Sequence, residues 1–270
     1  MGHTKLREAS FDISPLDNHR LTDLIPPLTV KIPGLPEYMH SFTSLSGSSL
    51  KGQSVISAPG NFDFGEKTLH TLPAGKNTGT LLHAILETVP FNIVDQGLQS
   101  LALQTHVSKY TLNTPFAKWQ PIICDIIYNT LTAKLPLGED SFSMSEVQAD
   151  LCYKEHEFVY TTDLEEQKNV AHTSYVKGII DLIFQHKGKY FIVDWKSNWL
   201  GQQTDDYISE NLARAMHEHH YYLQAELYKR ALKRYLHLCD PRPFEEVFGG
   251  VYYLFLRGLS SNSKNGIVLV

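Results

Sequence analysis

The chain has 270 residues, enough to bury a substantial core in one domain, or in one domain with an extension. No apolar run reaches the roughly 18 residues of a membrane-spanning helix, and we expect no signal peptide because residues 1–8 lack an apolar stretch. The three scattered cysteines favour reduced thiols in a cytoplasm and argue against a zinc ribbon. The net charge of −5 does not by itself indicate nucleic-acid binding, although it is compatible with a local basic groove.

Residues 1–70 are rich in proline, serine and glycine, with short hydrophobic pieces between them. We expect a linker or N-terminal wrapping segment there, followed by a globular domain over residues 71–270. Residues 60–68 superficially resemble a phosphate-binding P-loop, but Glu66 separates Gly65 from Lys67 and no strand precedes them. We therefore predict no nucleotide site.

The remaining sequence alternates between helical and strand patterns. Four helices are expected. The first begins near Thr78, a possible N-cap, the second covers about 95–113 and the third about 115–134. The fourth runs from an Asn211 cap to about Leu238. The expected strands are 153–160, the two arms of a hairpin over 175–196, and 249–256. This order predicts an α/β fold in which helices flank a mixed sheet.

The hairpin carries the most informative residues. Asp181 and Asp194 lie on either side of a predicted tight turn at Lys187-Gly188. A two- or four-residue loop places the two aspartates opposite each other, with Cβ atoms about 5 Å apart, whereas an odd-length loop shifts the pairing. Lys196 then points to the same face as Asp194. Because opposed like charges are destabilising, this arrangement indicates a divalent-metal site, although a lone Asp-x-Lys is more often a solvent-facing edge feature.

Other residues can complete such a metal site. Glu155 and Glu157 share one face of the preceding strand, so either can supply a third carboxylate, or both can belong to a solvated face. The carbonyl of Trp195 can also reach a metal. His83 can be a further ligand, although a lone histidine on a helix is more often a satisfied surface residue.

Two further groups lie on the predicted long helix. Gln224 and Tyr228 are one turn apart, so they can orient a carboxylate or a DNA backbone, or simply form an amphipathic face. The spacing of His217, His219 and His220 does not match that of a zinc site.

The chemistry that these residues suggest is metal-assisted phosphodiester hydrolysis. Carboxylates can hold Mg²⁺, which polarises the phosphate and lowers the pKa of a bound water. A nearby lysine can position the water or stabilise the developing negative charge.

Six segments together resemble the RecB nuclease-domain family, found at the C-terminal end of the beta subunit of exodeoxyribonuclease V in the RecBCD helicase–nuclease. The segments are 79–83, 154–158, 178–184, 192–201, 221–228 and 248–258. The resemblance runs from about Ser41 to near the C-terminus, and the order of the motifs is specific.

The resemblance implies a restriction-endonuclease-like PD-(D/E)xK nuclease core. It also implies a site in which the histidine and the two aspartates bind the metal, the lysine is catalytic, and two helical residues give support. These residues are His83, Glu155, Asp181, Asp194 and Lys196, with Gln224 and Tyr228 as the support. The helicase portion that precedes this domain in the family is missing, so we expect a fragment rather than a stand-alone relative.

The expected function is that of a Mg²⁺-dependent deoxyribonuclease of the exodeoxyribonuclease V type in the bacterial cytoplasm. It would cut single-stranded DNA unwound by the RecB helicase portion during double-strand break repair and recombination, alongside RecC-like and RecD-like subunits. One alternative is a catalytically silent nuclease-fold module that binds DNA or a partner subunit. Another is a site-specific endonuclease of the same fold, which a separate sequence-reading domain would favour, and the sequence shows no such domain.

Overall fold

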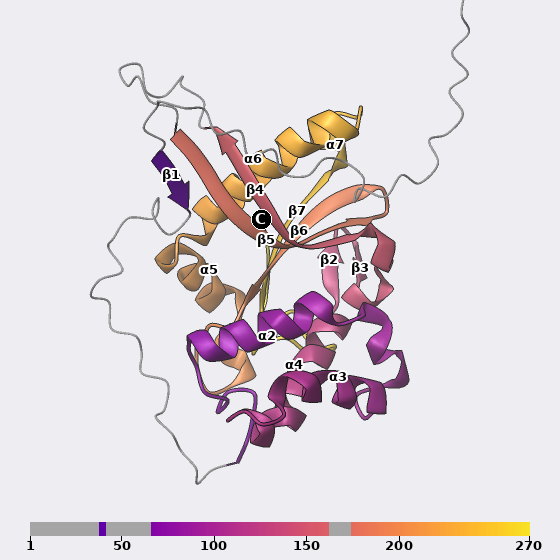
Figure 1. Cartoon of the computed structure of the whole chain (residues 1–270), viewed down its shortest axis with the longest axis vertical. Helices are drawn as coiled ribbons and strands as arrows, with labels where there is room; N and C mark the ends of the chain where they lie inside the picture. The colour runs from indigo at the N-terminus through magenta and orange to yellow at the C-terminus, as the bar shows by residue number, and fades with distance from the viewer. Residues whose placement is uncertain (1–37, 42–65, 162–173) are drawn as a thin grey trace, which may run out of the picture. The chain divides into compact units, whose positions relative to one another are not determined.

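A computed structural model describes residues 38–41, 66–161 and 174–270 of the chain (Figure 1). Most of the expected N-terminal segment, including most of the P-loop-like stretch, lies outside these residues. The boundary at residue 70 stays a prediction, although a strand from within that segment, β1 (Tyr38–Ser41), joins the sheet. No helix in the described part of the chain is both long and apolar enough to cross a membrane.

A six-stranded mixed sheet forms the centre of the domain. Its strand order is β1-β5-β6-β7-β8, and β4 pairs with β5. The strands other than β1 are β4 (Cys152–Thr161), β5 (Ser174–His186), β6 (Lys189–Lys196), β7 (Phe248–Phe255) and β8 (Ile267–Leu269). The pairs β1–β5 and β6–β7 are parallel, and the others are antiparallel. The predicted α/β class with a mixed sheet is therefore confirmed.

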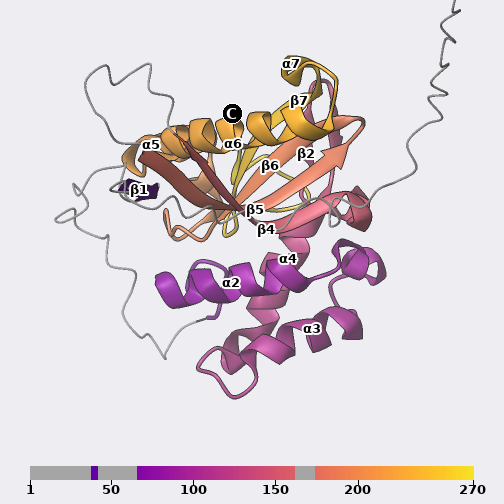
Figure 2. The same ribbon diagram turned by 45° about the horizontal axis from the view of Figure 1, so that its top comes forward.

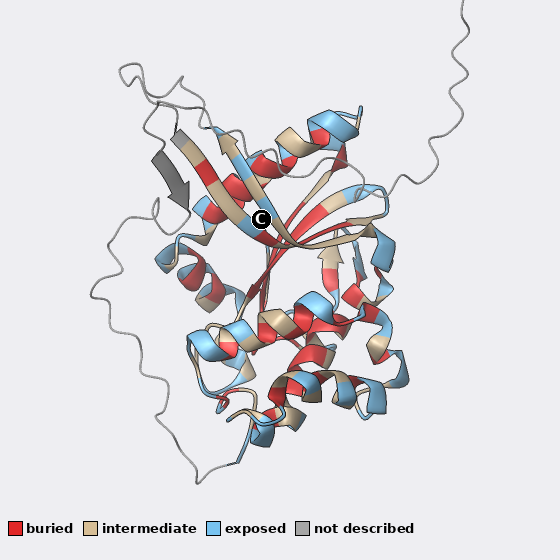
Figure 3. Cartoon of the chain, in the orientation of Figure 1, coloured by how far each residue is buried: buried red, intermediate tan, exposed pale blue. Residues whose placement is uncertain are grey.

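Helices cover both faces of this sheet (Figure 2). On one face lie α2 (Lys76–Thr88), α3 (Leu101–Thr111) and α4 (Gln120–Thr132), and on the other lie α5 (Ser209–Glu218), α6 (Tyr221–Cys239) and the short α7 (Phe244–Val247). The central strands β6 and β7 contribute alternate residues to two hydrophobic cores, one under each layer. Figure 3 shows that these strands are buried along most of their length.

Short elements complete the described fold, and sequence periodicity did not predict them. A two-stranded ribbon consists of β2 (Leu135–Leu137) and β3 (Asp140–Phe142). Single 3₁₀ turns lie at Phe91–Gln96, Ala117–Trp119, Met144–Glu146, Ala149–Leu151 and Thr204–Tyr207. Strands and turns of this length are too short to show a period.

The hairpin turn has the predicted geometry. The pairs from Leu182–Val193 to His186–Lys189 leave a two-residue loop at Lys187-Gly188. Both loop residues have positive φ, 47° and 75°, as in the primed turns that match the twist of the flanking strands. The predicted two-residue turn is therefore confirmed, and the paired residues end at Leu182–Val193, so the direct opposition of Asp181 and Asp194 stays a prediction.

Two expectations about helices were wrong. The long helix predicted from Asn211 to Leu238 is two helices, α5 and α6, because His220 adopts a left-handed conformation with φ 56° and breaks the hydrogen-bond ladder. Thr78 is not the N-cap of α2. The cap is Gly75, and the Thr78 hydroxyl instead donates to the Pro73 carbonyl at 2.7 Å.

Candidate active site

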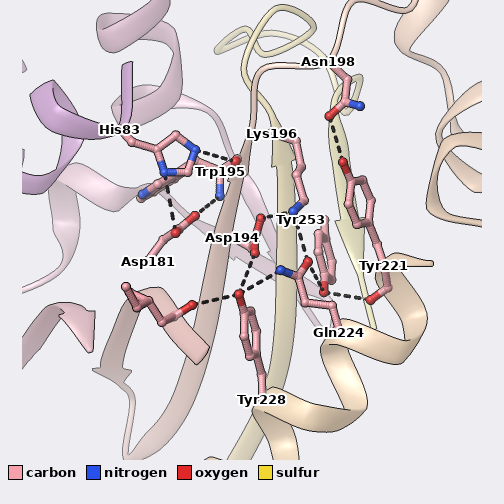
Figure 4. Close-up of polar contacts among 11 residues, drawn as sticks. His83, Asp181, Asp194, Trp195, Lys196, Asn198, Tyr221, Gln224, Tyr228 and Tyr253 are labelled. Carbon is pink, nitrogen blue, oxygen red and sulfur yellow. Dashed lines mark hydrogen bonds and ion pairs between the residues drawn. The ribbon is translucent and has the colours of Figure 1, made fainter. Parts of the chain in front are cut away.

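Three of the predicted residues meet where β4, β5 and α2 approach each other. His83, Glu155 and Asp181 each offer a ligand atom, and these atoms all lie within 4.8 Å of one another. The His83 Nδ1 atom lies 3.5 Å from Asp181 Oδ1 (Figure 4). All three side chains are half-buried, so the cluster remains within reach of solvent.

A local irregularity in the β4–β5 pair lies at Glu155 and Asp181, the two carboxylates of the cluster. Ile180 contacts the α6-side core, whereas Leu182 contacts the α2-side core, although residues two apart in a regular strand share a face. Glu155 has φ 49°, and it is skipped between the pairs Lys154–Leu182 and His156–Ile180. A left-handed residue within a strand is costly, and such conformations concentrate at functional sites.

The structure separates the two glutamates that the strand pattern left open. Glu155 belongs to the cluster with His83 and Asp181. Glu157 instead forms an ion pair with Lys177 at 2.6 Å, and its side chain is 53% exposed. Strand periodicity placed them on one face, but it could not register the left-handed backbone at Glu155.

Trp195 connects the cluster to β6 through its backbone. Its N–H donates to Asp181 Oδ2 at 2.8 Å, and its carbonyl lies 3.0 Å from His83 Nε2. Burial alone lowers the pKa of His83, but Asp181, Asp194 and this carbonyl together raise it above its usual value. A histidine binds a metal in its neutral form, so protonation of His83 would compete with metal binding there.

Asp194 and Lys196 form a buried ion pair with a distance of 2.6 Å between Lys196 Nζ and Asp194 Oδ2. Asp194 is only 2% exposed, and burial raises its pKa to about 6 despite the opposing effect of Lys196. Burial lowers the pKa of Lys196, but Asp194, Tyr221 and Asp181 together outweigh this effect, so the net pKa is raised and the ammonium is charged at neutral pH. Asp194 does not belong to the three-residue cluster, and its role as a metal ligand stays a prediction.

Gln224 and Tyr228 contact this pair from α6, as the sequence spacing allowed. Lys196 Nζ donates to Gln224 Oε1 at 3.0 Å, and Gln224 Nε2 donates to the Tyr228 hydroxyl at 2.8 Å. That hydroxyl lies 3.2 Å from Asp194 Oδ1 and 2.9 Å from the carbonyl of Ile179. The side chains of Asp194, Lys196, Gln224 and Tyr228 therefore form one hydrogen-bonded network.

Sequence reasoning missed three residues around Lys196. The Tyr221 ring lies 3.8 Å from Lys196 Nζ, and the Tyr253 ring lies 5.4 Å from it. The Tyr221 hydroxyl donates to Asn198 Oδ1 at 3.2 Å. Sequence position could have pointed to two of them. Tyr221 precedes Gln224 by one helical turn, and Tyr253 lies on β7, whose strand pattern was recognised.

The histidines rejected as a zinc site lie at the corner between α5 and α6. His217 packs on Tyr222, with ring centroids 4.9 Å apart, and His219 stacks on Tyr221 at 5.3 Å. Their rings therefore contact aromatic side chains.

Comparison of the sequence with known proteins shows the family of the chain. The family model for the PD-(D/E)XK nuclease superfamily matches residues 66–267 of the chain. The chain is 33% identical over 214 residues to RecBCD enzyme subunit RecB of Escherichia coli K12, a match that covers 71% of this chain and 18% of that protein. It is also 33% identical over 220 residues to RecB of Haemophilus influenzae, which covers 75% of this chain and 18% of that protein.

A longer match extends over nearly the whole chain. RecB of Borreliella burgdorferi is 26% identical over 289 aligned residues, covering 96% of this chain and 24% of that protein. The chain thus spans between 18% and 24% of the length of these relatives. The resemblance to the RecB nuclease domain is confirmed, and because the family model matches most of its residues, the chain belongs to the PD-(D/E)XK nuclease superfamily.

Proposed function

We propose that this chain is a Mg²⁺-dependent deoxyribonuclease domain that hydrolyses phosphodiester bonds with a metal-activated water. The observation that carries the proposal is the cluster of His83, Glu155 and Asp181, which Trp195 connects to the ion pair of Asp194 and Lys196. Carboxylates beside a charged lysine are the groups that this reaction requires.

The donor set suits a hard divalent cation. Glu155 and Asp181 supply carboxylate oxygens, and the cluster contains no cysteine. Burial raises the pKa of Glu155, and the negative charge of Asp181 adds to this effect. A cation would offset that repulsion, with His83, Glu155 and Asp181 as its ligands and Asp194 and the Trp195 carbonyl as further candidates. When bound, Mg²⁺ supplies phosphate polarisation and a water of lowered pKa.

Lys196 contributes positive charge rather than a basic site. Its raised pKa keeps the ammonium protonated at neutral pH, so it cannot take a proton from water there. It can donate a hydrogen bond to the phosphate and stabilise the charge that develops during attack. Asp194, Gln224 and Tyr221 hold the ammonium in place for this role.

The substrate and partners follow from the relatives. We propose that the chain cuts single-stranded DNA as the nuclease part of a RecBCD-type helicase–nuclease in the bacterial cytoplasm, acting in double-strand break repair and recombination. A RecB helicase portion and RecC-like and RecD-like subunits would be its partners. The identity to RecB of Escherichia coli and Haemophilus influenzae supports this assignment.

Cleavage of labelled single-stranded DNA tests the proposal, with Mg²⁺, with EDTA and with Asp194→Ala. We expect cleavage that requires Mg²⁺ and disappears in Asp194→Ala. The control is Asp140→Ala, because that aspartate is 73% exposed and contacts only Lys187 among the ion pairs of the described residues. Cleavage that survives Asp194→Ala would contradict the assignment. Binding of DNA by the folded wild type without cleavage would favour the silent binding module.

A further inference from the structure

Arg257, just beyond β7, is a fully buried cation whose hydrogen bonds within the described residues all go to backbone carbonyls. It is 0% exposed, and within the described residues it has no ion pair with a carboxylate. Its guanidinium donates to the carbonyls of Leu69 and Leu72 at 2.8 Å, of Pro73 at 3.0 Å and of Ser197 at 3.2 Å. A buried charge normally requires such hydrogen-bond partners. We call Arg257 and these four carbonyl groups the Arg257 clamp.

The clamp joins the two parts of the chain that supply the active site. Ser197 follows Lys196 at the end of β6, and the Lys196 carbonyl accepts from the backbone N–H of Leu256 at 2.9 Å. Residues 69–73 lead directly into α2, which carries His83. The Pro73 carbonyl also accepts from the Thr78 hydroxyl in the first turn of α2. Arg257 therefore holds the start of this helix against the end of the catalytic strand.

Gly79 allows the helix to come this close. A Cβ atom at Gly79 would lie 3.0 Å from Ser197 Oγ, tighter than ordinary contact. One turn later on the same face, His83 Nε2 reaches the Trp195 carbonyl at 3.0 Å. Four helical residues advance about 6 Å, and two strand residues advance about 6.6 Å, so the contacts 79–197 and 83–195 match in spacing.

We propose that the Arg257 clamp and Gly79 are a positioning device for the metal site. They set the depth at which α2 docks on β6, and so place the His83 ring at Asp181 and the Trp195 carbonyl. Arg257 and Gly79 are positioning residues, because neither touches the cluster of His83, Glu155 and Asp181. This inference rests on the proposed metal site.

The test adds a side chain at Gly79, where it meets Ser197, and then removes the Ser197 side chain. Gly79→Val pushes α2 away from Ser197, and Ser197→Gly in the same chain removes the obstructing hydroxymethyl group. The matched control is Thr80→Val, which places the same branched side chain at the next, exposed position of α2. Mg²⁺ affinity is measured by calorimetry, thermal unfolding is measured without metal, and the side-chain nitrogen resonances of His83 are recorded by NMR.

We expect Gly79→Val to weaken Mg²⁺ binding by about 10-fold or more, the loss typical of misplaced outer-shell support. Addition of Ser197→Gly should recover most of that loss, and Thr80→Val should bind as the wild type does. The His83 nitrogen resonances should move in Gly79→Val and return in the double variant, with or without metal. A packing role alone would lower the unfolding temperature and leave the affinity and the His83 resonances unchanged.

Equal Mg²⁺ affinity and equal His83 resonances in Gly79→Val and Thr80→Val would overturn the proposal. Should Gly79→Val fail to fold, Gly79→Ala replaces it, with the same rescue and the same overturning result. If the wild type binds no Mg²⁺, the proposed metal site fails, and the His83 resonances alone decide whether the Gly79–Ser197 contact positions that ring.

Discussion

Tyr228 has one hydroxyl proton and two acceptors for it. Its hydroxyl accepts from Gln224 and can donate to Asp194 or to the Ile179 carbonyl. Through this hydroxyl, α6 contacts both Asp194 of the ion pair and β5, the strand that carries Asp181. Burial, followed by the charge of Asp194, raises the Tyr228 pKa well above its usual value, so the hydroxyl stays protonated.

Tyr228→Phe should lower both stability and cleavage. It leaves the Gln224 amide without its acceptor, which costs about 1–3 kcal/mol, and it frees Asp194 to shift, which should slow cleavage about 10-fold. Urea unfolding and single-turnover cleavage measure the two effects. Tyr235→Phe is the control on the same helix, because no hydrogen bond of its hydroxyl is found in the described part of the chain. Equal behaviour of the two variants would refute the role given to Tyr228.

Glu155 and Glu157 offer a matched pair for the metal site. Glu155→Gln should weaken Mg²⁺ binding by at least about 10-fold, because it removes a carboxylate of the cluster. Glu157→Gln should leave the affinity nearly unchanged, since that carboxylate pairs with Lys177. Calorimetric titration with Mg²⁺ measures both. The reverse order of effects would assign the third carboxylate to Glu157.

At the scale of elements, short connections set where the strands begin. The 3₁₀ turn Met144–Glu146 is closed by a capping box, in which Glu146 Oε1 accepts from the backbone N–H of Ser143 at 3.2 Å. Lys134 donates to the same oxygen at 2.7 Å. This turn links the β2–β3 ribbon to the stretch that leads into β4, and so to Glu155.

The capping box should give a measurable pH dependence of stability. The hydrogen bond from Lys134 lowers the Glu146 pKa below its usual 4.5, with smaller support from Ser143. A depressed carboxyl pKa stabilises the fold above the unfolded pKa, and this stability is lost as pH falls through the folded pKa. Glu146→Gln should therefore cost about 0.5 kcal/mol at pH 7, since the pair is half-exposed, and this cost should disappear once the pH is below the folded pKa of Glu146.

Urea unfolding of wild type and Glu146→Gln at pH 7 and at a series of acidic pH values that passes through the folded pKa of Glu146 tests this window. Glu139→Gln is the control, because no salt bridge of Glu139 is found among the described residues. A cost that persists at the lowest pH would show that the effect comes from packing rather than from the ionised carboxylate.

At the scale of the molecule, the candidate active site contains residues from the helical layers on both faces of the sheet. His83 comes from the layer of α2, and Gln224 and Tyr228 come from α6 on the other face. A ligand that binds only the folded chain adds stability, about 2.7 kcal/mol at 100 times its Kd. For a domain of this size, that corresponds to a rise in Tm of about 5–10 °C.

Saturating Mg²⁺ should therefore raise the Tm of the wild type, and Asp181→Asn should abolish most of the rise. Differential scanning calorimetry with and without Mg²⁺ measures the shift, and Asp140→Asn is the control for loss of an exposed aspartate. The same Tm rise in Asp181→Asn as in the wild type would place Mg²⁺ elsewhere on the molecule.

Neighbours along the chain were enough to predict a turn, the fold class and one helix face. The turn residues Lys187-Gly188 and the two-residue period of a strand were enough to predict the hairpin pairing from Leu182–Val193 to His186–Lys189. The alternation of helices and strands was enough for the α/β class. The spacing of Gln224 and Tyr228 was enough to place them on one helix face, since these features depend only on neighbours along the chain.

The tertiary structure decided what depends on distant contacts. His83 and Trp195 are 112 positions apart, and only the docking of α2 on β6 brings them to 3.0 Å. Glu155 rather than Glu157 faces the cluster because of a left-handed residue within a strand, and α5 ends because of another at His220. Such conformations oppose local propensity, so only the surrounding packing can impose them, and no periodicity along the sequence records them.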